Sequence, residues 1–82
     1  MADTLYAPSP AAMAVRERVA ARITTIRKPT GTRQNELAVA CDFGPDEFSQ
    51  RMTGRVAFDL DELADIARAL DVDIAALLTE EA

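Results

Sequence analysis

The chain has 82 residues and a net charge of −5, with 49% hydrophobic but only 5% aromatic residues. This length allows one small domain, and a hydrophobic content made mostly of Ala, Leu, Val and Ile favours helices over a sheet. The sequence has no histidine, no cysteine pair, no Gly-rich phosphate loop and no apolar run near the roughly 18–20 residues that span a bilayer. Its first residues lack the basic stretch typical of a secretion signal. We therefore expect a cytoplasmic protein that is not an enzyme and that uses no cofactor, metal, membrane or small-molecule substrate.

The charge is unevenly distributed along the chain. Residues 1–55 carry eight basic and six acidic side chains, a balance of +2, whereas residues 56–82 carry one basic and eight acidic side chains, a balance of −7. A chain with one mildly basic part can still present a phosphate-binding face, so the overall charge does not exclude a nucleic-acid partner.

The chain is expected to begin with a flexible N-terminal tail over residues 1–10, which contain two prolines and no periodic apolar pattern. A single domain should follow over residues 11–82. The first helix is predicted from Ala11, because apolar residues then recur three or four positions apart. This stripe consists of Val15, Val19, Ile23 and Ile26. The helix should end before Pro29, since proline disfavours the helical conformation of the residue before it.

Two short helices are predicted next. The first runs over residues 33–41 with Thr32 as its cap. Its inner face consists of Leu37, Ala38 and Cys41. The second begins at Pro45, where a missing N–H costs nothing, and ends at Gly54. Its core anchors, four residues apart, are Phe48 and Met52. We interpret Cys41, a lone cysteine among apolar neighbours, as a small core residue and not an activated thiol.

The acidic run over residues 59–65 lacks the glycine and the ligand spacing of a calcium loop. It instead predicts a helix start, with Asp59 as the N-cap and Glu62 closing a capping box. The helix should bury Leu60, Leu63, Ala67 and Leu70. A last helix begins at Asp73 and carries Ile74, Leu77 and Leu78. The predicted core comprises Val19, Ile23, Leu37, Phe48, Met52, Leu63, Ala67 and Leu70.

The second and third helices are joined by a turn too short for an antiparallel pair, so they should cross steeply. Five residues of this segment, including the apolar anchor Phe48, form a pattern: Gln34, Ala38, Asp42, Phe48 and Ser49. The pattern resembles the helix-turn-helix of lambda-repressor-like and Cro-like regulators, and 54-GRVAFDLDELADIARALDVDIAALL-78 is similar to that family's last two helices. The resemblance covers about residues 12–79. It implies a compact, all-α, five-helix lambda-repressor-like helix-turn-helix domain.

Two places depart from the family pattern. Asp42 stands where the family usually has glycine, but aspartate tolerates a left-handed conformation better than most residues. The third helix begins with Pro45, Asp46 and Glu47, where the family often places Gln, Ser or Thr against base edges. Carboxylates accept from the N4 amino group of cytosine but are repelled by phosphates, and they also suit the first turn of any helix.

The resemblance implies a sequence-specific DNA-binding transcriptional regulator, a repressor of phage or bacterial type, with its third helix, about Pro45–Thr53, in the major groove of double-stranded DNA. The implied base contacts are Asp46, Glu47, Ser49 and Gln50. The implied backbone contacts are Arg33, Gln34, Arg51, Thr53, Arg55, Arg27 and Lys28. The last two residues have a second interpretation, which is compensation of the first helix's dipole. The remaining arginines of that helix, interpreted as a solvated face, are Arg16, Arg18 and Arg22.

One copy of so small a domain offers few phosphate contacts, so we expect a homodimer. The predicted dimer interface is the terminal helix, through Ile74, Leu77 and Leu78. An alternative function is a protein-binding module on the same fold, of the anti-repressor or antitoxin-like kind. The net charge and the acidic start of the third helix favour this alternative, whereas the positions of Arg33, Arg51 and Arg55 oppose it.

Overall fold

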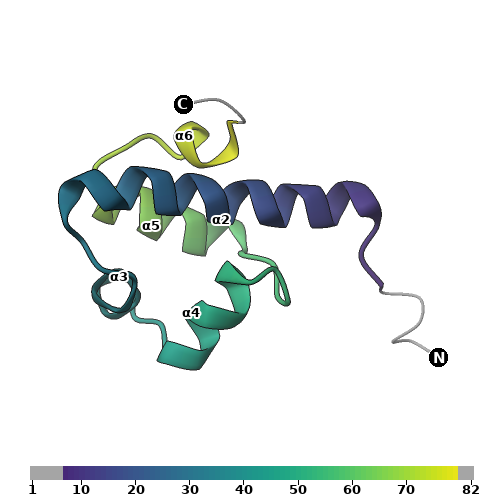
Figure 1. Ribbon diagram of the computed structural model, residues 1–82, viewed down its shortest axis with the longest axis horizontal. Helices are drawn as coiled ribbons and strands as arrows, with labels where there is room; N and C mark the ends of the chain where they lie inside the picture. Colours follow the sequence, from purple (N-terminus) through teal and green to yellow (C-terminus); the bar gives the residue numbers. More distant parts are fainter. Residues whose placement is uncertain (1–6, 80–82) are drawn as a thin grey trace.

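The computed structural model describes residues 7–79, and within them it contains five α-helices and no strand, which confirms the expected all-α class. The helices are α2 (Pro10–Thr30), α3 (Gln34–Ala40), α4 (Pro45–Met52), α5 (Leu60–Ala69) and α6 (Ala75–Leu78). Figure 1 shows α2 crossing the molecule, with α3 and α4 below it, α6 above it and α5 behind it. Most of the predicted tail, residues 1–6, and the last residues of the predicted domain, 80–82, lie outside the described residues.

α2 begins one residue earlier than predicted. The hydroxyl oxygen of Ser9 caps the helix by accepting a hydrogen bond from the Ala12 amide at 3.1 Å, and Pro10 occupies the first helical position. These local signals lie inside the segment that was assigned to the tail. Although α2 has 21 residues, neither it nor another helix of the described residues has an apolar stretch that could cross a membrane.

The prediction that the first helix ends before Pro29 was wrong. α2 continues to Thr30 and ends at Gly31, which has a left-handed φ of 79°. Pro29 lies in the last turn, where its missing N–H removes a single helical hydrogen bond. The Thr30 hydroxyl donates to the carbonyl of Arg27 at 2.6 Å, so that this end of the helix gains a side-chain hydrogen bond.

α3, α4 and α5 end in the same way, with a left-handed residue after the C-cap. These residues are Asp42, Gly54 and Asp71, with φ of 62°, 85° and 59°. After α3, the Asp42 amide donates to the Val39 carbonyl at 3.1 Å and the Phe43 amide donates to the Ala38 carbonyl at 2.8 Å. The pair of bonds defines a Schellman motif, and equivalent pairs follow α4 and α5. The expectation that Asp42 adopts the left-handed conformation is therefore confirmed.

The N-terminal caps of α3 and α5 differ in how well the sequence predicted them. The predicted capping box of α5 is confirmed, because Asp59 Oδ1 accepts from the Glu62 amide at 2.7 Å and Glu62 Oε1 accepts from the Asp59 amide at 3.0 Å. The predicted cap of α3 was wrong. Its N-cap is Arg33, not Thr32, and Glu36 Oε1 accepts from the Arg33 amide at 2.8 Å. The Thr32 hydroxyl is instead bonded to that of the preceding threonine.

The core lies between α2 and the shorter helices, and seven of the eight predicted core residues are buried. The exception is Met52, which is half-buried against the core. Ile66 was not predicted and is fully buried. Leu60 was predicted to be buried but is 71% exposed, because it occupies the first position of α5, outside the packed part of the helix. Three aromatic rings, of Phe43, Phe48 and Phe58, pack with centroids 5.2–6.2 Å apart.

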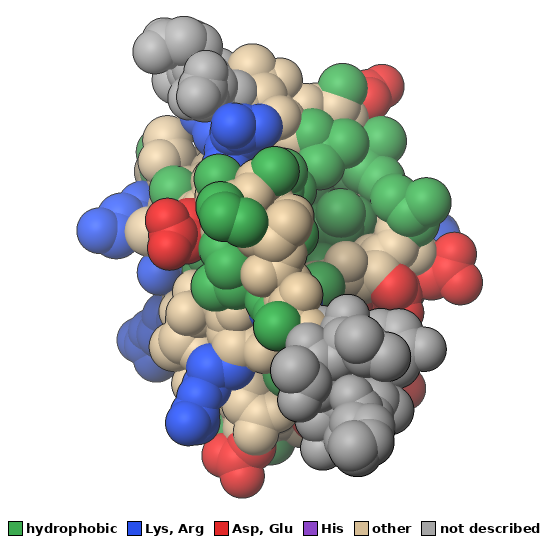
Figure 2. Space-filling model, turned by 90° about the vertical axis from the view of Figure 1, so that its right-hand side faces the viewer, with side chains coloured by type: hydrophobic (Ala, Val, Ile, Leu, Met, Phe, Trp, Pro, Cys, Tyr) green, Lys and Arg blue, Asp and Glu red, His purple; other side chains and the backbone are tan. Residues whose placement is uncertain are grey.

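α6 packs onto α2 and does not form a free surface. Leu77 is fully buried and Ile74 packs partly against the core, whereas Leu78 is 42% exposed. The Arg22 side chain, predicted to be solvated, donates from Nε to the Ala76 carbonyl at 2.9 Å and so joins α2 to α6. In this packing Leu77 is therefore a core residue and not a dimer contact. Figure 2 shows that the neighbouring surface nevertheless exposes a group of hydrophobic side chains.

Candidate functional site

The segment predicted to meet DNA consists of α3, α4 and the four residues between them. Figure 1 views α3 nearly end-on while α4 lies across the view, so the two helices cross steeply, as the short turn predicted. Small Ala38 is 4% exposed at this junction, and Phe48 anchors α4 with 1% exposure. Tight packing of both helices fixes the direction in which α4 presents its remaining side chains.

α4 has two distinct sides. Phe48 and Met52 point towards the core, four residues apart. At 100° per residue, the opposite side of the helix carries Asp46, Ser49, Gln50 and Thr53, and all four are exposed. Four of the predicted contact residues thus form one continuous polar surface, and the Thr53 hydroxyl also donates to the Gln50 carbonyl at 3.1 Å.

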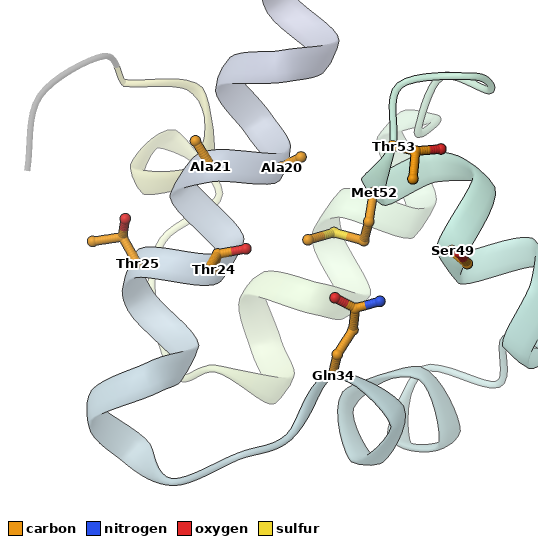
Figure 3. A pocket seen from close by; sticks show the side chains of 8 residues that line it. All are labelled: Ala20, Ala21, Thr24, Thr25, Gln34, Ser49, Met52 and Thr53. Atoms are coloured by element: carbon orange, nitrogen blue, oxygen red, sulfur yellow. The ribbon is translucent and has the colours of Figure 1, made fainter.

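A groove of about 530 Å³ connects this surface to the start of α3. It is lined by Gln34 from α3, by Ser49 and Met52 from α4 and Thr53 at its C-cap, and by Ala20, Ala21, Thr24 and Thr25 from α2. Figure 3 shows the Gln34 amide projecting between α2 and α4. The α2 wall of this groove was not predicted from the sequence. Its signal is the pair Ala20 and Thr24, four residues apart, beside the core stripe.

Glu47, a predicted base contact, caps its own helix. Its Oε1 accepts a hydrogen bond from the Gly44 amide at 2.8 Å, across the first turn of α4. A Cβ at position 44 would lie 3.2 Å from that oxygen, so glycine leaves the space that this contact uses. The carboxylate also faces the positive end of the helix dipole. Glu47 is exposed, but one of its oxygens is committed to α4.

Arg51, a predicted phosphate contact, is held inside the protein by three interactions. Its Nε lies 3.0 Å from Glu62 Oε1, its Nη1 donates to the Glu47 carbonyl at 2.9 Å, and its guanidinium lies 5.4 Å from the ring centre of Phe43. The side chain is 18% exposed. Arg51 follows Phe48 by three residues and therefore lies beside the inner face of α4. The structure thus places Arg51 between α4 and α5 and not on the outward surface.

Two arginines of α2 also make internal hydrogen bonds. Arg16, predicted to be solvated, donates from Nη1 to the carbonyls of Gly54 and Arg55 at 3.1 and 3.3 Å. Arg27, a predicted backbone contact, donates from Nη1 to the Thr32 carbonyl at 3.1 Å. The Nε atoms of both arginines are buried without a hydrogen-bond partner among residues 7–79. Both guanidinium groups therefore support turns next to α3 and α4.

Three of the predicted backbone contacts keep an exposed positive charge. Lys28, Arg33 and Arg55 are exposed, and their side chains form no hydrogen bond or ion pair within the described part of the chain. They come from the end of α2, the start of α3 and the turn after α4. The positive charge available to a phosphate near α3 and α4 is therefore smaller than the sequence suggested.

The interpretation of Cys41 as an unreactive residue agrees with its surroundings. It is partly buried against the core, and both this burial and the negative charge of Asp65 raise the pKa of its thiol. A raised pKa lowers the thiolate fraction that a nucleophile or a metal ligand needs. No group of three His, Cys, Asp or Glu side chains placed to hold a metal occurs among the residues that the structure describes.

Comparisons of the chain with models of protein families, with curated proteins and with solved structures find no match. The surface formed by α3, α4 and the turn between them is therefore interpreted from its own geometry.

Proposed function

We propose that this chain is a DNA-binding regulator, a repressor of phage or bacterial type acting in the cytoplasm, that inserts α4 into the major groove. The observation that carries the proposal is the meeting of two surfaces. The polar side of α4, with Ser49, Gln50 and Thr53, adjoins the groove that contains Gln34 at the start of α3. A protruding helix whose outward side chains are amides, hydroxyls and one carboxylate can enter the major groove and meet base edges there.

The outward residues of α4 suit direct recognition of base pairs. A glutamine such as Gln50 can pair through two hydrogen bonds with the N6 and N7 atoms of adenine, Ser49 can donate or accept, and Asp46 can accept from the N4 amino group of cytosine. Glu47 is the weaker candidate for a base contact, because reaching a base with both oxygens would break its bond to the Gly44 amide.

Contacts to the DNA backbone are assigned to exposed groups. Arg33, Arg55 and Lys28 supply the charge, and Gln34 and Thr53 supply neutral hydrogen bonds. Arg51 and Arg27 are withdrawn from this role, because internal hydrogen bonds hold their guanidinium groups. Three charged contacts per copy give weak binding, so a two-fold DNA site bound by two copies is part of the proposal.

One observation favours a second candidate, a protein-binding surface. The α3–α4 region exposes the carboxylates of Glu36, Asp42 and Asp46. Two of the predicted phosphate contacts, Arg51 on α4 and Arg27 on α2, are used internally. A partner with a basic surface would be attracted to these carboxylates, whereas DNA would be repelled.

A fluorescence titration separates the two candidates. The full chain is titrated with a pool of random-sequence duplexes at two salt concentrations, and bound duplexes are selected and sequenced. For DNA binding we expect an enriched sequence, weaker binding at higher salt, and a preference at one base pair that Gln50→Ala removes. Lys28, Arg33 and Arg55 replaced together by alanine should flatten the salt dependence by about three units, one for each contact. A chain that binds no duplex at low salt would exclude this proposal and leave the protein-binding surface.

A further inference from the structure

The exposed hydrophobic side chains among residues 7–79 are concentrated on one face. Within this described part of the chain four large ones are exposed, and they are Val15, Val39, Leu60 and Leu78. Val15 and Leu78 line a groove of about 320 Å³ together with Ala12, Ala57, Phe58 and Leu63. Leu60 precedes Leu63 by three residues on α5 and therefore lies on the same side of that helix. Only Val39, on α3, is separate from this cluster.

The groove lies where α2, the loop before α5 and α6 meet. Figure 2 looks onto this side of the molecule and shows hydrophobic side chains around a hollow. Scattered exposed apolar residues are normal on a monomer, but a hollow lined by them and bordered by protruding leucines is typical of a protein-protein contact. The face is distinct from the outward side of α4, because the groove contains no residue of α3 or α4.

We propose that this face binds a second copy of the same chain through a two-fold contact. Such a contact brings identical patches together, so each patch must offer both a protrusion and a recess. The protrusions here are Leu60, which is 71% exposed, and Leu78, which is 42% exposed, and the recess is the groove beside them. The groove has room for a leucine side chain from the other copy.

The same two-fold operation brings the basic edge of the face in one copy close to the acidic edge in the other. In Figure 2 most of the basic side chains lie along the left edge of the hydrophobic region and most of the acidic ones along the right edge. A rotation by half a turn about the vertical axis in the plane of the face sets the left edge of one copy against the right edge of the other. The difference follows the sequence, since residues 56–82 carry eight of the 14 acidic side chains but only one basic side chain. Complementary edges favour a second copy over an uncharged hydrophobic partner.

This contact differs from the interface expected from the sequence, because Leu77 takes no part in it and Leu60 does. Sedimentation equilibrium of the full chain without DNA tests it, and the result does not depend on whether the chain binds DNA. We expect a dimer of the unmodified chain. Leu60→Gln should raise the dimer dissociation constant at least tenfold, because each dimer would lose two buried leucine contacts. Leu78→Gln should have the same effect.

Val39→Gln is the matched control, since Val39 is as exposed as Leu60 but lies outside the cluster. It should leave the dissociation constant unchanged, and thermal unfolding followed by circular dichroism should show that each variant is folded. Three results would overturn the proposal. They are a chain that stays monomeric up to its solubility limit, a dimer that tolerates Leu60→Gln, and equal weakening by Val39→Gln.

Discussion

Arg51→Met tests whether the arginine in the last turn of α4 stabilises the fold or binds DNA. The structure gives Arg51 a partly exposed ion pair with Glu62, a hydrogen bond to the Glu47 carbonyl and a position over the ring of Phe43. Partly exposed ion pairs contribute at most about 1 kcal/mol, a hydrogen bond about 1 kcal/mol, and a cation–π contact about 0.5 kcal/mol. Methionine retains the apolar contact with Phe43, so we expect the free energy of unfolding to fall by about 1–2 kcal/mol.

Urea unfolding followed by circular dichroism measures that loss, and a DNA titration at several salt concentrations measures the other role. If Arg51 acts only inside the protein, the salt slope of Arg51→Met should equal that of the unmodified chain. Arg51→Lys is the control: it keeps the charge but not the forked donors, so it should lose stability almost as Arg51→Met does. Unchanged stability together with a salt slope lower by about one unit would refute this reasoning and restore Arg51 as a phosphate contact.

Phe48→Ala should lower the free energy of unfolding by about 3–5 kcal/mol in denaturant titrations, and a stable Phe48→Ala variant would contradict the core. Leu77→Asp, which places a charge in a fully buried position, should give a chain without the helical circular dichroism of the native fold, whereas a folded monomer would contradict the position of α6. Gly54→Ala should cost about 1–2 kcal/mol because φ is 85°, and an unchanged unfolding midpoint would contradict the left-handed end of α4. Glu47→Gln weakens the cap on Gly44 and removes a charge that repels phosphates. Stability should therefore fall by about 0.5 kcal/mol while affinity for random-sequence DNA rises, and a fall in that affinity would contradict the assignment.

Some features of the fold that depend on neighbouring residues were predictable from the sequence, although the cap of α3 and the end of α2 were not. The capping box of Asp59 and Glu62 involves atoms three residues apart, and the left-handed Asp42 follows from a short turn between two apolar helices. Prediction was less successful where burial depends on distant elements. Leu60 fits the apolar spacing of α5 but is exposed, and Leu77 is buried because α6 packs on α2.

The candidate site was also only partly predictable from the sequence. The outward positions of α4 follow from helical spacing, since Phe48 and Met52 identify its inner side. The internal role of Arg51 does not follow from helical spacing, because its partner Glu62 is eleven residues away on another helix. The role of Arg16 does not follow from it either, since Arg16 donates to carbonyls 38 and 39 residues away. The sequence shows that an arginine is present, but the tertiary contacts decide whether its charge remains available.

Because α4 has an inner and an outward side, substitutions on its outward side affect recognition and folding separately. Phe48, Met52 and Arg51 anchor the helix and Glu47 caps it, whereas the side chains of Asp46, Ser49 and Gln50 form no hydrogen bond or ion pair with any of residues 7–79. Substitutions at these three positions can therefore accumulate without unfolding the domain. A library that varies only them, selected against different targets, could acquire new partners on an unchanged scaffold.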